Sequence, residues 1–177
     1  IHKKHSFSMQ IGDPNIVASK IPVPVISDFR NMHIALGGQG APLVPEFHQE
    51  IFYQKNISKI ILNIGGIANY SFVKNKKSLW GSDVGPGNAL MDAYCKKFLN
   101  IPFDDNGSLA AKGTIINSEL KKLLNHRFFK SKFPKSTGKE IFNLTMLSKT
   151  FLKKNPSNVL ATPVSYTHLR AHETSQH

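Results

Sequence analysis

Residues 59–73, which read KIILNIGGIANYSFV, give the clearest indication of the fold. Two runs of β-branched and aromatic residues, the composition typical of strands, flank a Gly-Gly pair. Paired glycines between two such runs predict a tight turn and therefore a β-hairpin. Backbone N–H groups at a glycine pair can also converge on an anion, because no Cβ atoms stand in the way. This stretch alone fits a phosphate-binding turn at Gly65 and Gly66 and an ordinary hairpin equally well.

A second glycine segment follows at residues 82–92, which read SDVGPGNALMD. The apolar residues before it predict a strand that ends near Asp83, and Asn88 predicts the start of a helix. A carboxylate in this position can take a proton beside a bound phosphate, because a helix N-terminus favours anions. The alternative is that Asp83 accepts hydrogen bonds that stabilise its own loop, and both interpretations stay open.

The region before the hairpin combines a predicted strand with a third glycine segment. Residues 21–29 (IPVPVISDF) are rich in apolar and β-branched residues, which predicts a buried strand. Residues 37–45 (GGQGAPLVP) contain three glycines and two prolines and predict an irregular loop. Arg30 lies between these segments. Its guanidinium can bind an oxyanion with two hydrogen bonds, or it can pair with Asp28 at the end of the strand.

Helical patterns dominate the rest of the chain. Apolar residues recur at helical spacing after Asn88, after residues 117–118 and over residues 144–154. Predicted strands in the first part of the chain and predicted helices in the second part indicate a layered α/β domain. Residues 163–177 break the composition, because they contain no lysine and three of the eight histidines. This tail resembles the read-through found at the ends of metagenomic gene models. We therefore expect it to be non-native, with no site and little packing.

Composition excludes several classes of protein. The chain has 177 residues, of which 40% are hydrophobic and 10% aromatic, enough to form a folded core. Its apolar runs are too short for a transmembrane helix, and its one cysteine, Cys95, excludes an intrachain disulfide framework. The net charge of +12 makes a basic nucleic-acid-binding module an alternative. However, the lysines occur in scattered pairs, which is typical of solvated helix surfaces.

Six motifs occur in an order that resembles one family. They are QIGDP (residues 10–14), DFR (28–30), GGQGAPLVP (37–45), LNIGGIAN (62–69), DVGPGNALMD (83–92) and PKSTGKEIFN (134–143). From about Met9 to Thr162 the chain resembles the anhydro-N-acetylmuramic acid kinases, of the actin-like ATPase and sugar-kinase superfamily. The resemblance implies a ribonuclease-H-like α/β fold with two lobes. Residues 1–56 correspond to the C-terminal part of the first lobe and residues 57–162 to the N-terminal part of the second, so we expect a central fragment.

The resemblance also implies an activity and a set of site residues. Such kinases open 1,6-anhydro-N-acetylmuramic acid with water and phosphorylate its O6 from ATP with Mg²⁺, which gives N-acetylmuramic acid 6-phosphate in cell-wall recycling. By this resemblance Asp83 is the catalytic base. The residues expected to contact the nucleotide are Gly65, Gly66, Asn69 and Gly85. Those expected to contact the amino sugar are Arg30, Gly38, Gln39 and Asn88. No residue is assigned as a metal ligand.

The implied enzyme is a cytoplasmic homodimer at full length, with a small-molecule substrate and no nucleic-acid or membrane partner. Another sugar or acetate kinase of the same superfamily is the alternative, although it would lack the GGQGAPLVP and PKSTGKEIFN motifs. Because the chain contains about half of a nucleotide site by this comparison, we expect it to be inactive alone.

The chain departs from the family pattern at three positions. Val84 stands where Thr is usual, Ser82 replaces an aromatic residue and His33 replaces an Asp. These departures bear on efficiency and substrate choice more than on the class of reaction. The resemblance assigns no role to Lys135 or Thr137.

Overall fold

The computed structural model describes residues 7–38, 40–75 and 78–174, and the chain divides into two compact units. The first unit is Ile1–Leu43 and the second is Val44–His177. This division lies earlier than the expected boundary between residues 56 and 57. The reason is α3 (Pro45–Phe52), which packs on β2 and β3 of the second unit.

The first unit contains two short helices, α1 (Pro14–Ala18) and α2 (Phe29–Ala35). The prediction of a buried strand over residues 21–29 is wrong, because residues 21–28 are irregular, Phe29 begins α2, and most of the apolar side chains in this segment are exposed. Two of its residues are prolines, which have no N–H group to donate to a neighbouring strand. The predicted loop over residues 37–45 is confirmed for the residues described there, and it ends where α3 begins.

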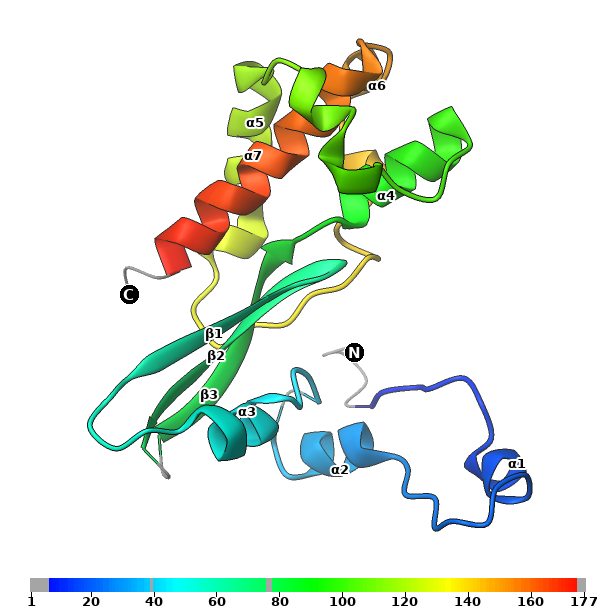
Figure 1. Ribbon diagram of the computed structural model, residues 1–177, viewed down its shortest axis with the longest axis vertical. Coiled ribbons are helices and arrows are strands. Elements are labelled where there is room, and N and C mark those ends of the chain that lie inside the picture. Colours follow the sequence, from blue (N-terminus) through cyan, green and yellow to red (C-terminus); the bar gives the residue numbers. More distant parts are fainter. Residues whose placement is uncertain (1–6, 39, 76–77, 175–177) are drawn as a thin grey trace. The chain divides into compact units, whose positions relative to one another are not determined.

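The second unit is built on a three-stranded antiparallel sheet in the order β1-β2-β3. The predicted hairpin is confirmed as β1 (Lys59–Ile64) and β2 (Ile67–Asn75), and β3 (Ser78–Pro86) pairs with β2. Figure 1 shows α3 alongside this sheet, in agreement with its contacts to β2 and β3. The strand predicted before the second glycine segment is confirmed, but it runs on to Pro86, so Asp83 lies inside β3 and not at its end. The Gly65–Gly66 turn and Gly87 lie at one end of the sheet.

Helices follow the sheet, and Figure 1 shows the first of them, α4 (Ala89–Tyr94), directly beyond the end of β3. It continues into a π-helical turn, η1 (Cys95–Leu99). The later α-helices are α5 (Asn117–Leu124), α6 (Lys149–Leu152) and α7 (Pro156–Thr174). The 3₁₀ turns between them are η2 (Asp105–Gly107), η3 (Ala110–Lys112), η4 (Arg127–Lys130) and η5 (Leu144–Met146). The helices predicted after Asn88 and residues 117–118 are thus confirmed, whereas the third is divided between η5 and α6.

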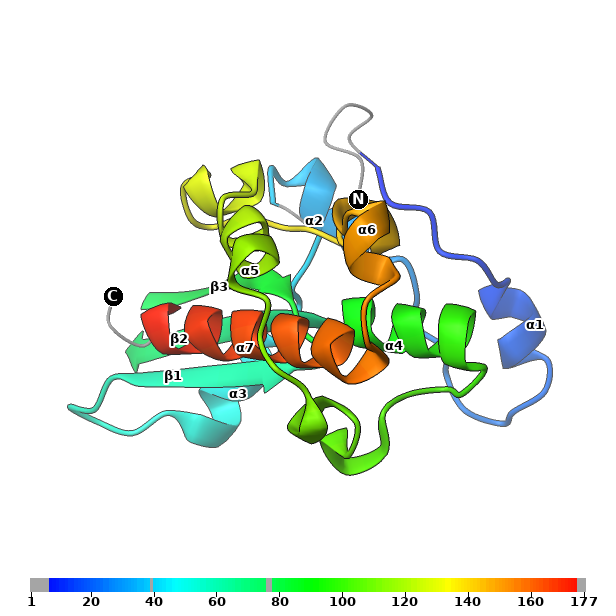
Figure 2. The ribbon, with the colours of Figure 1, turned by 90° about the horizontal axis from the view of Figure 1, so that it is seen from above.

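Most of the buried apolar side chains lie between these helices, where α5 and α7 run side by side (Figure 2). The main cluster is formed by Leu90, Tyr94, Cys95, Ala110, Leu120, Leu123, Leu147, Phe151, Val159, Leu160 and Tyr166. A smaller cluster on the sheet consists of Ala68, Tyr70 and Val84. Within the residues that the structure describes, none of the helices combines the length and apolar character needed to span a membrane.

The last helix, α7, includes residues that the sequence analysis assigned to a tail. The expectation of little packing there is wrong, because Tyr166 is 1% exposed and belongs to the helical cluster. The Oγ1 atom of Thr167 lies 3.3 and 3.2 Å from the carbonyl oxygens of Pro86 and Gly87. Tyr166 follows the buried Val159 by two helical turns, so one helix face carries both side chains. The non-native origin of residues 163–177 stays a prediction.

Candidate active site

A row of polar side chains crosses the sheet next to the glycine turn. Asn63, Asn69 and Asp83 occupy directly paired positions on β1, β2 and β3, and paired residues of an antiparallel sheet project to the same face. Exposure falls along this polar row: Asn63 is exposed, Asn69 is half-buried and Asp83 is 6% exposed. The structure therefore brings the predicted base, Asp83, beside Asn69, a predicted nucleotide-binding residue. Asn63 was not singled out from the sequence.

The Asp83 carboxylate is bonded to residues 135–137, which run along the edge of β3. Its Oδ2 atom accepts hydrogen bonds from the Thr137 N–H at 2.8 Å and from the Ser136 hydroxyl at 3.2 Å. The Asp83 N–H donates to the carbonyl oxygen of Lys135 at 2.9 Å. Donors to a carboxylate stabilise its ionised form, which is the form that a general base needs. The same hydrogen bonds therefore allow Asp83 both to stabilise this loop and to act as a general base.

Residues 135–137 are anchored by a buried lysine. Lys135 is 5% exposed, and its ammonium donates to the carbonyl oxygens of Phe128 and Ser131 at 3.0 and 3.2 Å. The Nζ atom also lies 4.6 and 4.3 Å from the ring centroids of Phe128 and Phe133. Carbonyl oxygens and aromatic faces offset the cost of burying a cation. Lys135, which had no role in the sequence analysis, therefore holds this loop in place.

The glycine turn of the hairpin supports the helix that follows β3. The carbonyl oxygen of Gly65 accepts from the Asn88 N–H at 2.9 Å, and that of Gly66 accepts from the N–H groups of Gly87 and Ala89 at 3.0 and 3.2 Å. A Cβ atom on Gly87 would overlap the Gly65 carbonyl oxygen, so this close approach requires glycine. The N–H groups of Gly87, Asn88 and Ala89, before and at the start of α4, are therefore bonded to the turn, and a phosphate contact at this helix end stays a prediction.

A lysine side chain lies over the glycine turn. A Cβ atom built on Gly66 would meet Lys139 Cε at 3.0 Å, Lys139 Nζ at 3.6 Å and Asn88 Oδ1 at 3.8 Å. Gly66 and Asn88, predicted to bind nucleotide and sugar respectively, are thus neighbours and share this surface with Lys139. Lys139 was not singled out from the sequence, although the KSTGKE motif contains it.

Gly85 has different surroundings from the other predicted nucleotide-binding residues. It is buried in β3 with a φ of 149°, and a Cβ atom there would approach the ring of Phe129 and the hydroxyl of Tyr166. The structure therefore gives Gly85 a packing role, and its contact with a nucleotide stays a prediction.

The predicted sugar-binding residues Arg30 and Gly38 belong to the first unit, and Gln39 lies outside the described residues. The Nη1 atom of Arg30 donates to the carbonyl oxygen of Gly40 at 2.7 Å. His33 accepts a hydrogen bond from the Gly40 N–H through Nδ1 at 3.1 Å. Arg30 and His33 therefore brace the glycine loop, and His33 does so at a position where the sequence departs from the family pattern.

Burial raises the pKa of Tyr70 to about 12, so its phenol keeps its proton at neutral pH. Tyr70 follows Asn69 in β2, so its side chain lies on the opposite face of the sheet from the polar row, where it packs with Ala68 and Val84. The residues that the structure describes include no group of three or more His, Cys, Asp or Glu side chains that could hold a metal ion. Mg²⁺ takes its ligands from carboxylates, water and phosphates, so these residues do not fit a magnesium site made by protein side chains alone.

Comparison with known proteins gives one family. The family model for anhydro-N-acetylmuramic acid kinase matches residues 1–176. A protein of that name from a gamma-proteobacterium is 63% identical over 167 residues, which cover 94% of this chain and 46% of the relative. The corresponding protein of Acinetobacter baylyi is 46% identical over 178 residues, with coverages of 93% and 47%. That of Coxiella burnetii is 45% identical over 168 residues, with coverages of 93% and 45%. The chain thus spans about half the length of the curated relatives it matches.

Proposed function

Because the chain belongs to the anhydro-N-acetylmuramic acid kinase family, we propose that it forms the catalytic-base region of such an enzyme. The enzyme opens the 1,6-anhydro bridge of N-acetylmuramic acid with water and transfers a phosphoryl group from ATP to O6. The observation that carries this proposal is the Asp83 carboxylate, which ends the polar row of the sheet and is held there by two hydrogen-bond donors.

Asp83 acts as the general base in this scheme. Water attacks the anomeric carbon and gives a proton to the Asp83 carboxylate, while the bond between the anomeric carbon and O6 breaks and leaves its electron pair on O6. O6 then attacks the γ-phosphorus of ATP, and the bond to the β–γ bridging oxygen breaks as ADP leaves. The proton on Asp83 passes to solvent and regenerates the carboxylate. One carboxylate thereby activates the water, and the ring opening that follows frees O6 for the transfer.

The glycine turn is proposed to face the nucleotide phosphates. Phosphoryl transfer depends on positioning and on charge stabilisation. Gly65 and Gly66 leave the turn without side chains, Asn69 lies beside Asp83, and the Lys139 ammonium provides positive charge over the turn. Gly85 continues the backbone from Asp83 toward this turn. Mg²⁺ accompanies ATP in the proposal, and no described residue is assigned to it.

The remaining assignments follow from family membership. Arg30, Gly38 and Gln39 are proposed to contact the amino sugar, together with Asn88. The full enzyme is proposed to have two ribonuclease-H-like lobes, with residues 1–56 in the first and residues 57–162 in the second. It is further proposed to be a homodimer in the cytoplasm that needs no nucleic-acid or membrane partner.

A full-length chimera tests this function. In it, the present chain replaces the matching 46% of the gamma-proteobacterial relative. With ATP and 1,6-anhydro-N-acetylmuramic acid, the chimera is expected to release ADP and form the 6-phosphate. The 177-residue chain alone is expected to show no turnover, because one phosphate-facing surface cannot position ATP. Phosphorylation of acetate or of another sugar, with no reaction of the anhydro sugar, would instead favour a different kinase of the superfamily.

A further inference from the structure

We propose that Ser136 is a positioning residue for the Asp83 base, presented by a loop that Lys135 anchors. This inference rests on the proposed function of Asp83 and adds a role that the sequence motifs left open. The loop consists of residues 135–137, which pair with the edge of β3 and bring two donors to one carboxylate oxygen.

Both donors restrict how the carboxylate can turn. The Thr137 N–H and the Ser136 hydroxyl bond to the same atom, Asp83 Oδ2, at 2.8 and 3.2 Å. A rotation of the carboxylate about its Cβ–Cγ bond would stretch both hydrogen bonds together. A general base works only when its oxygen stays within hydrogen-bond reach of the proton it removes. Groups that fix the orientation of a reacting side chain therefore affect the rate without touching the substrate.

The loop is itself fixed to β3 from two sides. Its backbone is held by the Asp83 N–H, which donates to the Lys135 carbonyl oxygen at 2.9 Å, and by the Lys135 N–H, which donates to Ser82 Oγ at 2.9 Å. The Ser82 side chain is fully buried, so this second bond is shielded from water. The Lys135 ammonium, bonded to backbone carbonyl oxygens, anchors the other side. Ser136 and Thr137 follow directly, so their donors reach Asp83 from a fixed backbone.

Of the two residues that donate to the Asp83 carboxylate, Ser136 is the one whose hydrogen bond depends on its side chain. Thr137 bonds to Asp83 through its backbone N–H, which any residue except proline provides. Ser136 bonds through its hydroxyl, which alanine lacks and threonine keeps. Substitutions at position 136 therefore test the positioning role with little change to the backbone.

The test uses the full-length chimera and a double-mutant cycle. Ser136→Ala is expected to lower kcat about tenfold with an unchanged KM for ATP, because a hydrogen bond to a charged group is lost. Ser136→Thr is expected to restore most of this loss. In the Asp83→Asn background Ser136→Ala is expected to cause no further loss, because the base that it positions is already absent.

Ser148→Ala is the matched control, since the Ser148 hydroxyl also bonds to a buried carboxylate, that of Glu119, at 3.2 Å. It is expected to lower the unfolding temperature and to leave kcat unchanged. An unchanged kcat in Ser136→Ala, while Asp83→Asn loses activity, overturns the positioning role and leaves the function of Asp83 intact. An equal loss in both backgrounds shows a merely structural role and also overturns it. Full turnover in Asp83→Asn overturns the base assignment and this inference with it.

Discussion

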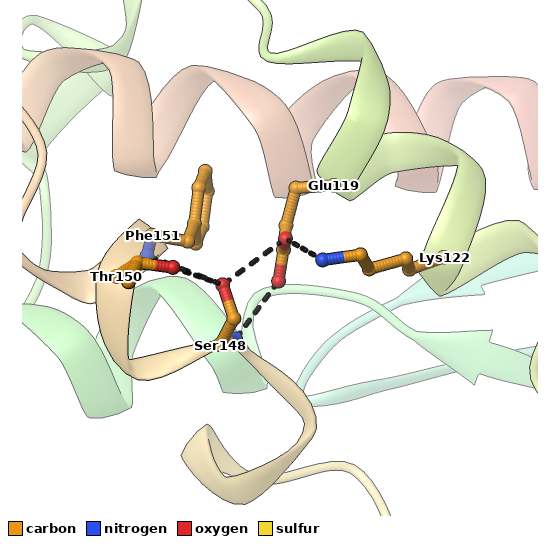
Figure 3. A network of polar contacts seen from close by, with 5 residues as sticks. All are labelled: Glu119, Lys122, Ser148, Thr150 and Phe151. Carbon is orange, nitrogen blue, oxygen red and sulfur yellow. Dashed lines mark hydrogen bonds and ion pairs between the residues drawn. The ribbon is translucent and has the colours of Figure 1, made fainter.

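Two buried carboxylates of the second unit have similar partners and different surroundings. Glu119, 3% exposed, accepts hydrogen bonds from the Ser148 N–H at 2.8 Å and from the Ser148 hydroxyl at 3.2 Å (Figure 3). Asp83, 6% exposed, likewise accepts from one backbone N–H and one serine hydroxyl. The hydrogen bonds of a buried carboxylate therefore do not distinguish a structural group from a catalytic one.

Position in the fold separates the two groups. Glu119 lies in the first turn of α5 and bonds to the N-cap of α6, so it joins two helices of the core. Its ion pair with Lys122 at 3.2 Å stays within α5. Asp83 instead ends the polar row across the sheet, in which exposure increases from β3 to Asn63 on β1. A buried carboxylate thus becomes a candidate base when the residues paired with it lead to an exposed polar position such as Asn63.

The largest expected effect comes from removing the Asp83 charge. In the chimera, Asp83→Asn is expected to lower kcat on the order of 10²–10⁴ with a much smaller change in KM, because the general base is lost while shape is kept. Steady-state kinetics with the anhydro sugar measure this. Asp92→Asn, inside α4, is the control and is expected to affect mainly stability. Near-full turnover in Asp83→Asn would show that Asp83, like Glu119, is structural.

The next effect concerns the support of β3 by α7. Deletion of residues 163–177 removes Tyr166 from the core and Thr167 from its contacts with the turn after β3. Loss of one buried aromatic side chain typically costs about 3–5 kcal/mol, so we expect a destabilisation of that size in urea unfolding of the 177-residue chain. A chain that ends at Thr174 keeps all of α7 and serves as control. A change within about 0.5 kcal/mol would instead support a tail without packing.

A smaller effect is expected from Glu119, the carboxylate that joins α5 and α6. Glu119→Gln loses an acceptor for the Ser148 hydroxyl and for Lys122, and is expected to cost about 1–3 kcal/mol of unfolding free energy with little change in kcat. Lys122→Ala is the control. The Lys122 side chain is 65% exposed, so its ion pair is expected to contribute less than about 1 kcal/mol. A large loss of kcat in Glu119→Gln would break the distinction between the two carboxylates.

Local patterns predicted the parts of this fold that depend on local chemistry. The hairpin around Gly65 and Gly66 follows from strand-forming residues on either side of a glycine pair, and the structure has it. The strand predicted over residues 21–29 is absent because that prediction relied on the apolar composition, although the two prolines of the segment cannot donate hydrogen bonds to a sheet. The burial of Tyr166 was not predicted because residues 163–177 were set aside for their unusual composition. The helix nevertheless continues through them, and its register places Tyr166 against the core.

The candidate site was only partly predictable for a related reason. Asp83 stood out because neighbouring residues predict a strand that ends there and a glycine turn directly after it, although the structure places Asp83 inside β3. Ser136 and Thr137 lie more than fifty positions away, and their bonds to Asp83 arise only when residues 135–137 pack along β3. The sequence likewise does not show that the carbonyl oxygens of Gly65 and Gly66 accept hydrogen bonds from the backbone at the start of α4.

The smallest predicted effect is a pH dependence of the unfolding free energy, which arises at His126 near the loop that holds Asp83. His126 Nδ1 accepts a hydrogen bond from the Phe128 N–H at 3.3 Å, and Phe128 in turn contacts the Lys135 ammonium that anchors the Asp83 loop. Burial, with a smaller contribution from Arg127, lowers the pKa of His126. The folded state thus binds this proton less readily than the unfolded state, whose histidine has a pKa of about 6.5.

The contribution of His126 to stability is therefore complete above about pH 6.5 and is lost as the pH falls through the lowered pKa of the folded state. Urea unfolding of the 177-residue chain between pH 8 and pH 5 measures it. His126→Asn keeps a side-chain acceptor at this N-cap but does not titrate, so its stability is expected to fall less over this range. Parallel curves for the two proteins would contradict the assignment. A steeper fall in the unsubstituted chain would support His126, whose Nδ1 accepts from Phe128 beside the Lys135 ammonium, as the source of this pH dependence.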